Sequence, residues 1–186
     1  MIRSALAYTR FMASALADPA ARALVMAHRK PARGGAFEHH TALRDAVGYL
    51  LRAQQEGTDK GMGSYHLING WGASYPETTG YAIPTLIAAA ELLGWEAARQ
   101  AAVQAADWLV TIQHTDGGWQ GGRIGEGRPS IVFNTAQVVR GMLAAHEVTG
   151  RSEFLDAALR AGRWIASVQD TDGAWRGSNF MGAARV

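Results

Sequence analysis

The chain has no cysteine among its 186 residues. This absence excludes disulfide bonds, thiolate metal ligands and a cysteine nucleophile, and it slightly favours the cytosol. The sequence also lacks a run of about 18 apolar residues, so we expect no membrane-spanning helix. The N-terminus lacks the apolar core of a secretory signal peptide. We therefore expect a cytoplasmic protein.

The chain also has no large excess of positive or negative charge. The 18 Lys and Arg residues nearly balance the 16 Asp and Glu residues, for a net charge of +2. So small an excess argues against a nucleic-acid partner. No phosphate loop, Ser-His-Asp order or metalloprotease signature is present, and we expect no cofactor and no metal. We interpret His39, His40 and Asp45 as a solvated helix start rather than a metal site.

The sequence does contain one motif twice, at 108–119 and again at 164–175, here called the repeated phrase. Hydrophobic residues make up 48% of the chain, enough to bury a core around such units. A repeat of this length is typical of stacked arrays of structural units. The shared positions are Trp108, Gln113, Gly117 and Trp119 in the first copy, and Trp164, Gln169, Gly173 and Trp175 in the second.

Apolar residues at helical spacing predict helices throughout the chain. Gly94 and Gly150 are expected to end helices, and Asn134 to cap one. A degenerate earlier copy of the phrase covers 49–54, with 61–65 standing where Asp-Gly-Gly-Trp should be. We expect a helical segment at 1–35 and the repeat array at 36–186. The predicted helices cover 2–17, 20–29, 37–55, 81–93, 95–113, 134–149 and 152–169.

The repeated phrase resembles the Gln-Trp repeat of the terpenoid-cyclase and prenyltransferase superfamily, over about residues 41–186. The resemblance implies an all-α fold, an α/α toroid of helical hairpins whose inner helices ring a cavity. It further implies about half of a full ring, and hence a truncated product, a fragment or a half that self-associates or pairs with a missing C-terminal half. The Asp-x-Asp-Asp signature of squalene-type cyclases and the cysteine of the prenyltransferase zinc site are absent.

A second resemblance concerns residues 70–81, which are similar to repeat proteins of bacterial polysaccharide metabolism. It implies a small-molecule or glycan ligand. Glu77 precedes a predicted inner helix, where the helix dipole favours a carboxylate. We predict Glu77 as an acid or base with Tyr75 or His66 as its partner. The alternative is that Glu77 is only a helix-start residue.

Other loop residues are candidates for binding substrate. Trp71 and Tyr81 could stack on a sugar ring or on a carbocation, or simply pack in the loop. Arg123 and Arg128 could bind a carboxylate or phosphate, or be solvated, and Asn134 opens the next inner helix.

Two acidic residues of the phrase, Asp116 and Asp172, each stand before a glycine, and we interpret them as turn residues.

Three hypotheses remain open at this stage. The favoured one is a cavity enzyme acting on a glycan as a hydrolase, lyase or epimerase. A two-carboxylate hydrolase needs a second acid, for which Glu126 is the candidate. The alternatives are isoprenoid cyclisation and a non-catalytic repeat scaffold.

Overall fold

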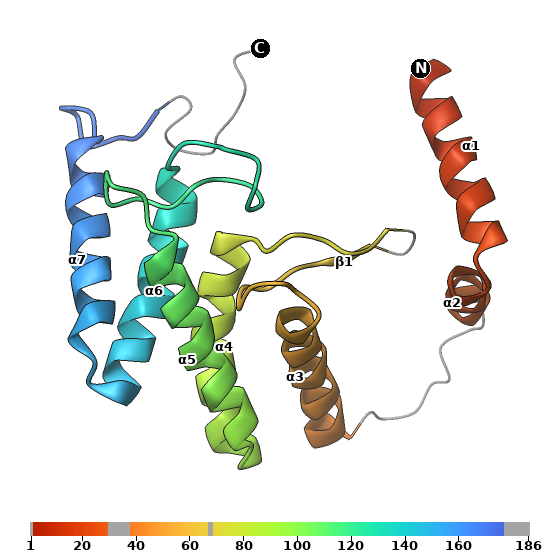
Figure 1. The fold of residues 1–186 in the computed structure, drawn as a ribbon, viewed down its shortest axis with the longest axis horizontal. Coiled ribbons are helices and arrows are strands. Elements are labelled where there is room, and N and C mark those ends of the chain that lie inside the picture. Colours follow the sequence, from red (N-terminus) through yellow and green to blue (C-terminus); the bar gives the residue numbers. More distant parts are fainter. Residues whose placement is uncertain (1, 30–37, 67–68, 177–186) are drawn as a thin grey trace.

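The computed structural model describes residues 2–29, 38–66 and 69–176 (Figure 1). Apart from one two-stranded sheet, all regular structure in these residues is helical, so the predicted all-α fold is confirmed. None of the helices in these residues has the length and apolar character needed to cross a membrane. The elements are α1 (Ile2–Ala17), α2 (Pro19–Arg29), α3 (His39–Gln55), β1 (Tyr65–His66), β2 (Gly70–Trp71), α4 (Pro76–Leu93), α5 (Glu96–Thr111), α6 (Val132–Thr149) and α7 (Ser152–Ser167).

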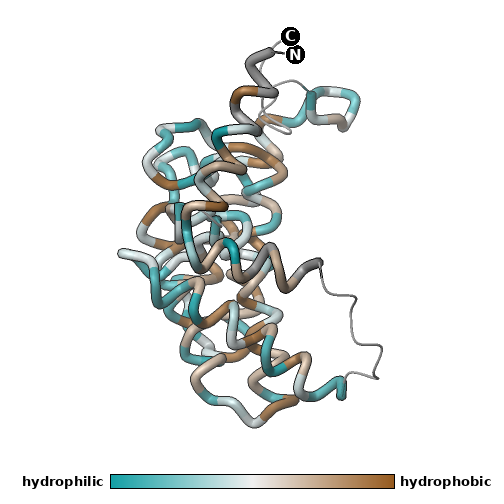
Figure 2. Tube along the Cα trace, turned by 90° about the vertical axis from the view of Figure 1, so that its right-hand side faces the viewer, coloured by the Kyte–Doolittle hydropathy of each residue, from teal (hydrophilic) through white to brown (hydrophobic). Residues whose placement is uncertain are grey.

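The five helices from α3 onward pack against one another. Helix α5 contacts both α3 and α7, so these three form a row. Helices α4 and α6 form the most extensive helix pair, and each also packs on the helix that follows it. Figure 2 shows hydrophobic and hydrophilic residues alternating along the helices, the pattern of elements that bury one face.

Small side chains let the helices approach closely. Five alanines of α5 are at most 5% exposed, and the larger buried side chains fill the spaces around them. The alanines are Ala98, Ala101, Ala102, Ala105 and Ala106. The largest fully buried side chains are Trp119, Phe154, Met62, Ile83, Leu86, Leu109 and Met142.

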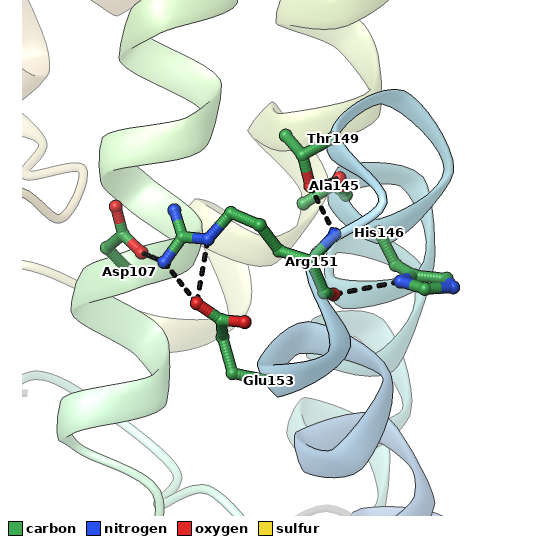
Figure 3. Close-up of polar contacts among 6 residues, drawn as sticks. All are labelled: Asp107, Ala145, His146, Thr149, Arg151 and Glu153. Atoms are coloured by element: carbon green, nitrogen blue, oxygen red, sulfur yellow. Dashed lines mark hydrogen bonds and ion pairs between the residues drawn. The ribbon is translucent and has the colours of Figure 1, made fainter.

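Each hairpin turns on a left-handed glycine, as predicted: Gly94 has φ 59° and Gly150 has φ 70°. After the second turn, Arg151 ties α7 to α5 (Figure 3). Its guanidinium lies 2.5 Å from the Asp107 carboxylate and 2.7 Å from that of Glu153. The Arg151 carbonyl also lies 2.9 Å from the His146 ring.

Two predicted helix starts were wrong. Helix α4 begins at Pro76 rather than at 81, so Glu77 lies inside its first turn and Pro84 inside the helix. Helix α6 begins at Val132, and its N-cap is Ile131 rather than Asn134. Both helices start earlier because tertiary contacts hold their first turns, as described below.

The N-terminal helices α1 and α2 contact each other. Figure 1 shows them to one side of the other helices, the side toward which the β1–β2 hairpin extends. There the Phe11 ring meets the His66 ring edge-on, with centroids 6.2 Å apart. The predicted division at 35 lies outside the described residues and stays a prediction.

Candidate functional site

Glutamine side chains link neighbouring helices of the α3–α5–α7 row by hydrogen bonds. The Gln113 amide donates to the carbonyls of Gly117 at 2.8 Å and Ala157 of α7 at 2.9 Å. The Gln54 amide donates to the carbonyls of Lys60 and Ala101 of α5, both at 2.9 Å. Each glutamine therefore closes its own turn and holds the next helix of the row.

The tryptophans of the repeated phrase close the same turns. The Trp119 Nε1 donates to the Leu109 carbonyl at 2.8 Å, and the Trp175 Nε1 donates to the Ile165 carbonyl at 2.9 Å. Trp119 is completely buried. The two copies thus share geometry as well as sequence.

Threonines join each turn to the helix that follows its loop. The Met62 N–H donates to Thr79 Oγ1 at 2.8 Å, and the Trp119 N–H donates to Thr135 Oγ1 at 2.9 Å. Met62 therefore stands where Trp119 stands in the next copy. The equivalent turn therefore covers 59–62, two residues earlier than the approximate placement at 61–65, with Gly61 and Met62 in common.

Aspartates complete these turns. Asp116 Oδ1 accepts from the Gly118 N–H at 2.8 Å and from Ser130 Oγ at 2.9 Å. Asp59 Oδ1 accepts from Gly61 and from Ser74 in the same way. Asp116 is thus engaged in the turn, as predicted. The loops are pinned to the first turns of α4 and α6, on the same side of the molecule (Figure 1).

This scaffold brings three predicted site residues together. The buried Asn134 amide donates to Glu77 Oε2 at 2.9 Å and lies 3.5 Å from the Tyr75 hydroxyl. Tyr75 is the residue before α4, Glu77 is in its first turn, and Asn134 is in the first turn of α6. A carboxyl, an amide and a phenol therefore meet where two helices begin.

Burial sets the protonation of this cluster. Removal from water raises the pKa of Glu77 above its ordinary value of 4.5. The start of α4 and the Asn134 amide favour the ionised form, but desolvation is the dominant effect. A carboxyl group with a raised pKa can donate or accept a proton nearer neutral pH than an exposed one.

Other predicted site residues lie elsewhere. His66 is in β1, where its Nδ1 accepts from the Asn69 N–H at 3.2 Å. Trp71 packs between the rings of Tyr49 and Tyr65, with centroids 5.6 and 5.4 Å away, and lines a pocket of about 310 Å³. His66 and Trp71 thus belong to the β1–β2 hairpin, whereas Glu77 belongs to the first turn of α4.

Tyr81 lies one turn beyond Glu77 on α4. The Arg140 guanidinium of α6 lies 5.8 Å from the centroid of the Tyr81 ring. Tyr81 and Arg140 line a pocket of about 520 Å³ together with side chains of α3 and α4. The apolar part of this lining comes from Leu43, Pro84, Ala88, Ala89 and Leu92. Tyr81 is therefore placed for contact with an apolar ligand surface.

The two predicted loop arginines differ in their surroundings. Arg128 is paired with Glu126 at 2.6 Å. Arg123 donates to Ser64 Oγ at 3.4 Å, and within the described ranges no carboxylate lies at ion-pair distance from it. Arg123 is consequently the better placed of the two to meet an anionic ligand.

Comparison with known proteins adds one relative. The chain is 31% identical over 153 residues to squalene–hopene cyclase from Zymomonas mobilis, which covers 75% of this chain. The similarity supports a terpenoid-cyclase-like relation. The chain spans about a fifth of the length of that relative. No protein-family profile matches the chain, and no solved structure matches it.

Proposed function

We propose that the chain is a terpenoid-cyclase-like domain built from α/α-toroid hairpins. The consecutive hairpins α4–α5 and α6–α7, the glutamine bonds between row helices and the similarity to squalene–hopene cyclase support this proposal. The expected cytoplasmic location stays a prediction.

For its activity, we propose an acid/base site that acts on a glycan. The observation that carries this proposal is the 2.9 Å hydrogen bond from Asn134 to the desolvated Glu77 carboxyl group. Glu77 would transfer the proton, and Asn134 would hold the Glu77 carboxyl group in place. The Tyr75 hydroxyl would be a second proton donor. Arg123 and the ring of Trp71 would bind the ligand further along the loops.

The proposed reaction is proton transfer at carbon, as in a lyase or epimerase, rather than hydrolysis. Two-carboxylate hydrolysis needs a second acidic group across the scissile bond. Within the described residues no second carboxylate contacts Glu77, and the nominated Glu126 is paired with Arg128. Glu77 would remove the proton beside a sugar carboxylate. The Tyr75 hydroxyl would then donate a proton, in a lyase to the leaving glycosidic oxygen as the double bond forms, or in an epimerase to the opposite face of the carbon.

A panel of acidic and neutral polysaccharides tests this activity, with products detected by mass spectrometry and ultraviolet absorbance. Glu77→Gln keeps an acceptor for Asn134 but cannot transfer the proton, so turnover should fall by about 100-fold or more. Glu91→Gln, an exposed substitution at the other end of α4, is the matched control. Equal turnover by Glu77→Gln and the unmodified protein would refute the assignment.

Isoprenoid cyclisation is the second candidate function, favoured by the similarity to squalene–hopene cyclase and by the apolar pocket beside Tyr81. The missing Asp-x-Asp-Asp signature counts against it. Incubation with squalene and with a prenyl diphosphate tests it, and absence of any cyclic product would remove it. If neither the polysaccharides nor the isoprenoid substrates are converted, the non-catalytic repeat scaffold is the remaining hypothesis.

A further inference from the structure

The glutamine bonds along the row end at α7. Gln54 of α3 donates to a carbonyl of α5, and Gln113 of α5 donates to a carbonyl of α7. Gln169, at the same position after α7, donates to its own Gly173 carbonyl at 2.7 Å. In the described part of the chain no helix follows α7, so Gln169 contacts no next helix.

The other end of the row, α3, shows the complementary pattern. Tyr49 stands five residues before Gln54, as Trp108 and Trp164 stand before their glutamines. Trp108 is 8% exposed and Trp164 9%, but Tyr49 is 42% exposed.

Glycines from the preceding turn account for this difference in exposure. A Cβ on Gly61 would lie 2.5 Å from the Trp108 ring, and one on Gly118 would lie 3.1 Å from the Trp164 ring. No described turn precedes α3 in this way. Tyr49 is the ring on which a preceding turn would pack.

The open side of α7 also differs from the same side of α5. Asp107 shows which side of α5 faces α7, because it binds Arg151. One turn earlier on that side, Val103 of α5 is partly buried, whereas the corresponding Leu159 of α7 is 47% exposed. An apolar side chain of α7 is therefore left uncovered where α5 has a neighbour.

We propose that these two ends bind each other between two copies of the chain, with α7 of one copy beside α3 of the next. In this arrangement Gln169 donates to the carbonyl of Ala42 in the second copy. Ala42 precedes Tyr49 by seven residues, as Ala101 precedes Trp108 and Ala157 precedes Trp164.

A second copy fits because the contact would continue an interface that the chain already forms twice internally. The contact is head-to-tail, so it joins two different surfaces and can close into a ring. The proposal does not depend on the cluster of Glu77, Tyr75 and Asn134, which stands at the starts of α4 and α6 rather than on α3 or α7.

Light scattering coupled to size exclusion tests the proposal on the full chain across a concentration series. The expected mass is a dimer or larger multiple of 19.9 kDa. Tyr49→Arg and Leu159→Arg should each reduce the mass to that of the monomer. Leu143→Arg, at an exposed position of α6 outside both surfaces, should leave the assembly intact. Circular dichroism confirms that each variant is folded.

Mixing the two variants makes the test specific for head-to-tail contact. In a solution of one variant alone, every α7–α3 contact between two copies includes one substituted surface. In an equimolar mixture, the intact α7 end of Tyr49→Arg meets the intact α3 end of Leu159→Arg, so dimers should return. An unmodified protein that stays monomeric, variants that remain assembled or a mixture that stays monomeric would each overturn the proposal.

Discussion

Gly80 of α4 and Gly141 of α6 lie at the closest approach of these helices. A Cβ on Gly141 would lie 2.7 Å from the Gly80 carbonyl oxygen, and one on Gly80 would lie 2.7 Å from the Val138 Cα. Pro84, four residues after Gly80, has no N–H to donate to that carbonyl. The two glycines thus set the spacing of the helices whose first turns hold Glu77 and Asn134.

Replacing either glycine should therefore destabilise the fold. Gly80→Ala and Gly141→Ala each place a methyl group against backbone atoms that cannot move aside, and should lower the free energy of unfolding by about 1–3 kcal/mol. Gly162→Ala is the control, because that helical glycine of α7 is exposed and has no atom near its Cβ position. The control should gain about 0.5–1 kcal/mol. Urea denaturation measures all three, and a stable Gly80→Ala would contradict the close contact.

Thr79 and Thr135 should also be essential to stability. Thr79→Val and Thr135→Val keep the side-chain shape but leave the buried N–H of Met62 or Trp119 without its acceptor. An unsatisfied buried donor costs about 1–3 kcal/mol. Thr85→Val, at an exposed position of the same helix, should change stability by no more than about 0.5 kcal/mol. Thermal unfolding of the three variants makes the comparison, and equal melting temperatures would refute this role.

The sequence predicted the helices well where periodicity and end signals agreed. Gly94 and Gly150 ended helices as expected, because their left-handed conformations are a local property of glycine. The starts of α4 and α6 were missed because contacts distant in sequence hold them. Thr79 and Gly80 resemble loop residues locally, but one binds Met62 and the other contacts α6.

The candidate site was only partly predictable. Glu77 and Tyr75 were predicted together, but Asn134 was predicted separately, and its contact with them depends on how α4 packs on α6. The 56-residue spacing of the repeat contained a usable signal. The position 56 residues after Glu77 is 133, which is next to Asn134. His66 was predicted to share a loop with Glu77, but it lies in the β1–β2 hairpin, where its ring meets that of Phe11. No local pattern in the sequence indicated that hairpin.

Gln54 should contribute more to stability than its neighbour Gln55. The Gln54 side chain is 4% exposed and bonds two carbonyls, one of them on α5. Gln54→Ala should lower the free energy of unfolding by about 1–3 kcal/mol, because the carbonyls of Lys60 and Ala101 lose this donor. Gln55→Ala, an exposed substitution at the end of the same helix, should have little effect. Urea denaturation decides, and a Gln54→Ala variant as stable as Gln55→Ala would show that the link between α3 and α5 is dispensable.

The Glu77 carboxyl group should make stability depend on pH. Because burial raises the pKa of Glu77 above 4.5, its contribution to stability is fully present below pH 4.5 and is lost as the pH rises through the raised value. Glu77→Gln cannot ionise and still accepts from Asn134, so it should gain stability relative to the unmodified protein between pH 4 and pH 7. Thr78→Val, an exposed change in the same turn, should show a constant difference. Urea denaturation at several pH values measures the effect, and a Glu77→Gln difference that shrinks with rising pH would mean that desolvation does not dominate at this carboxyl group.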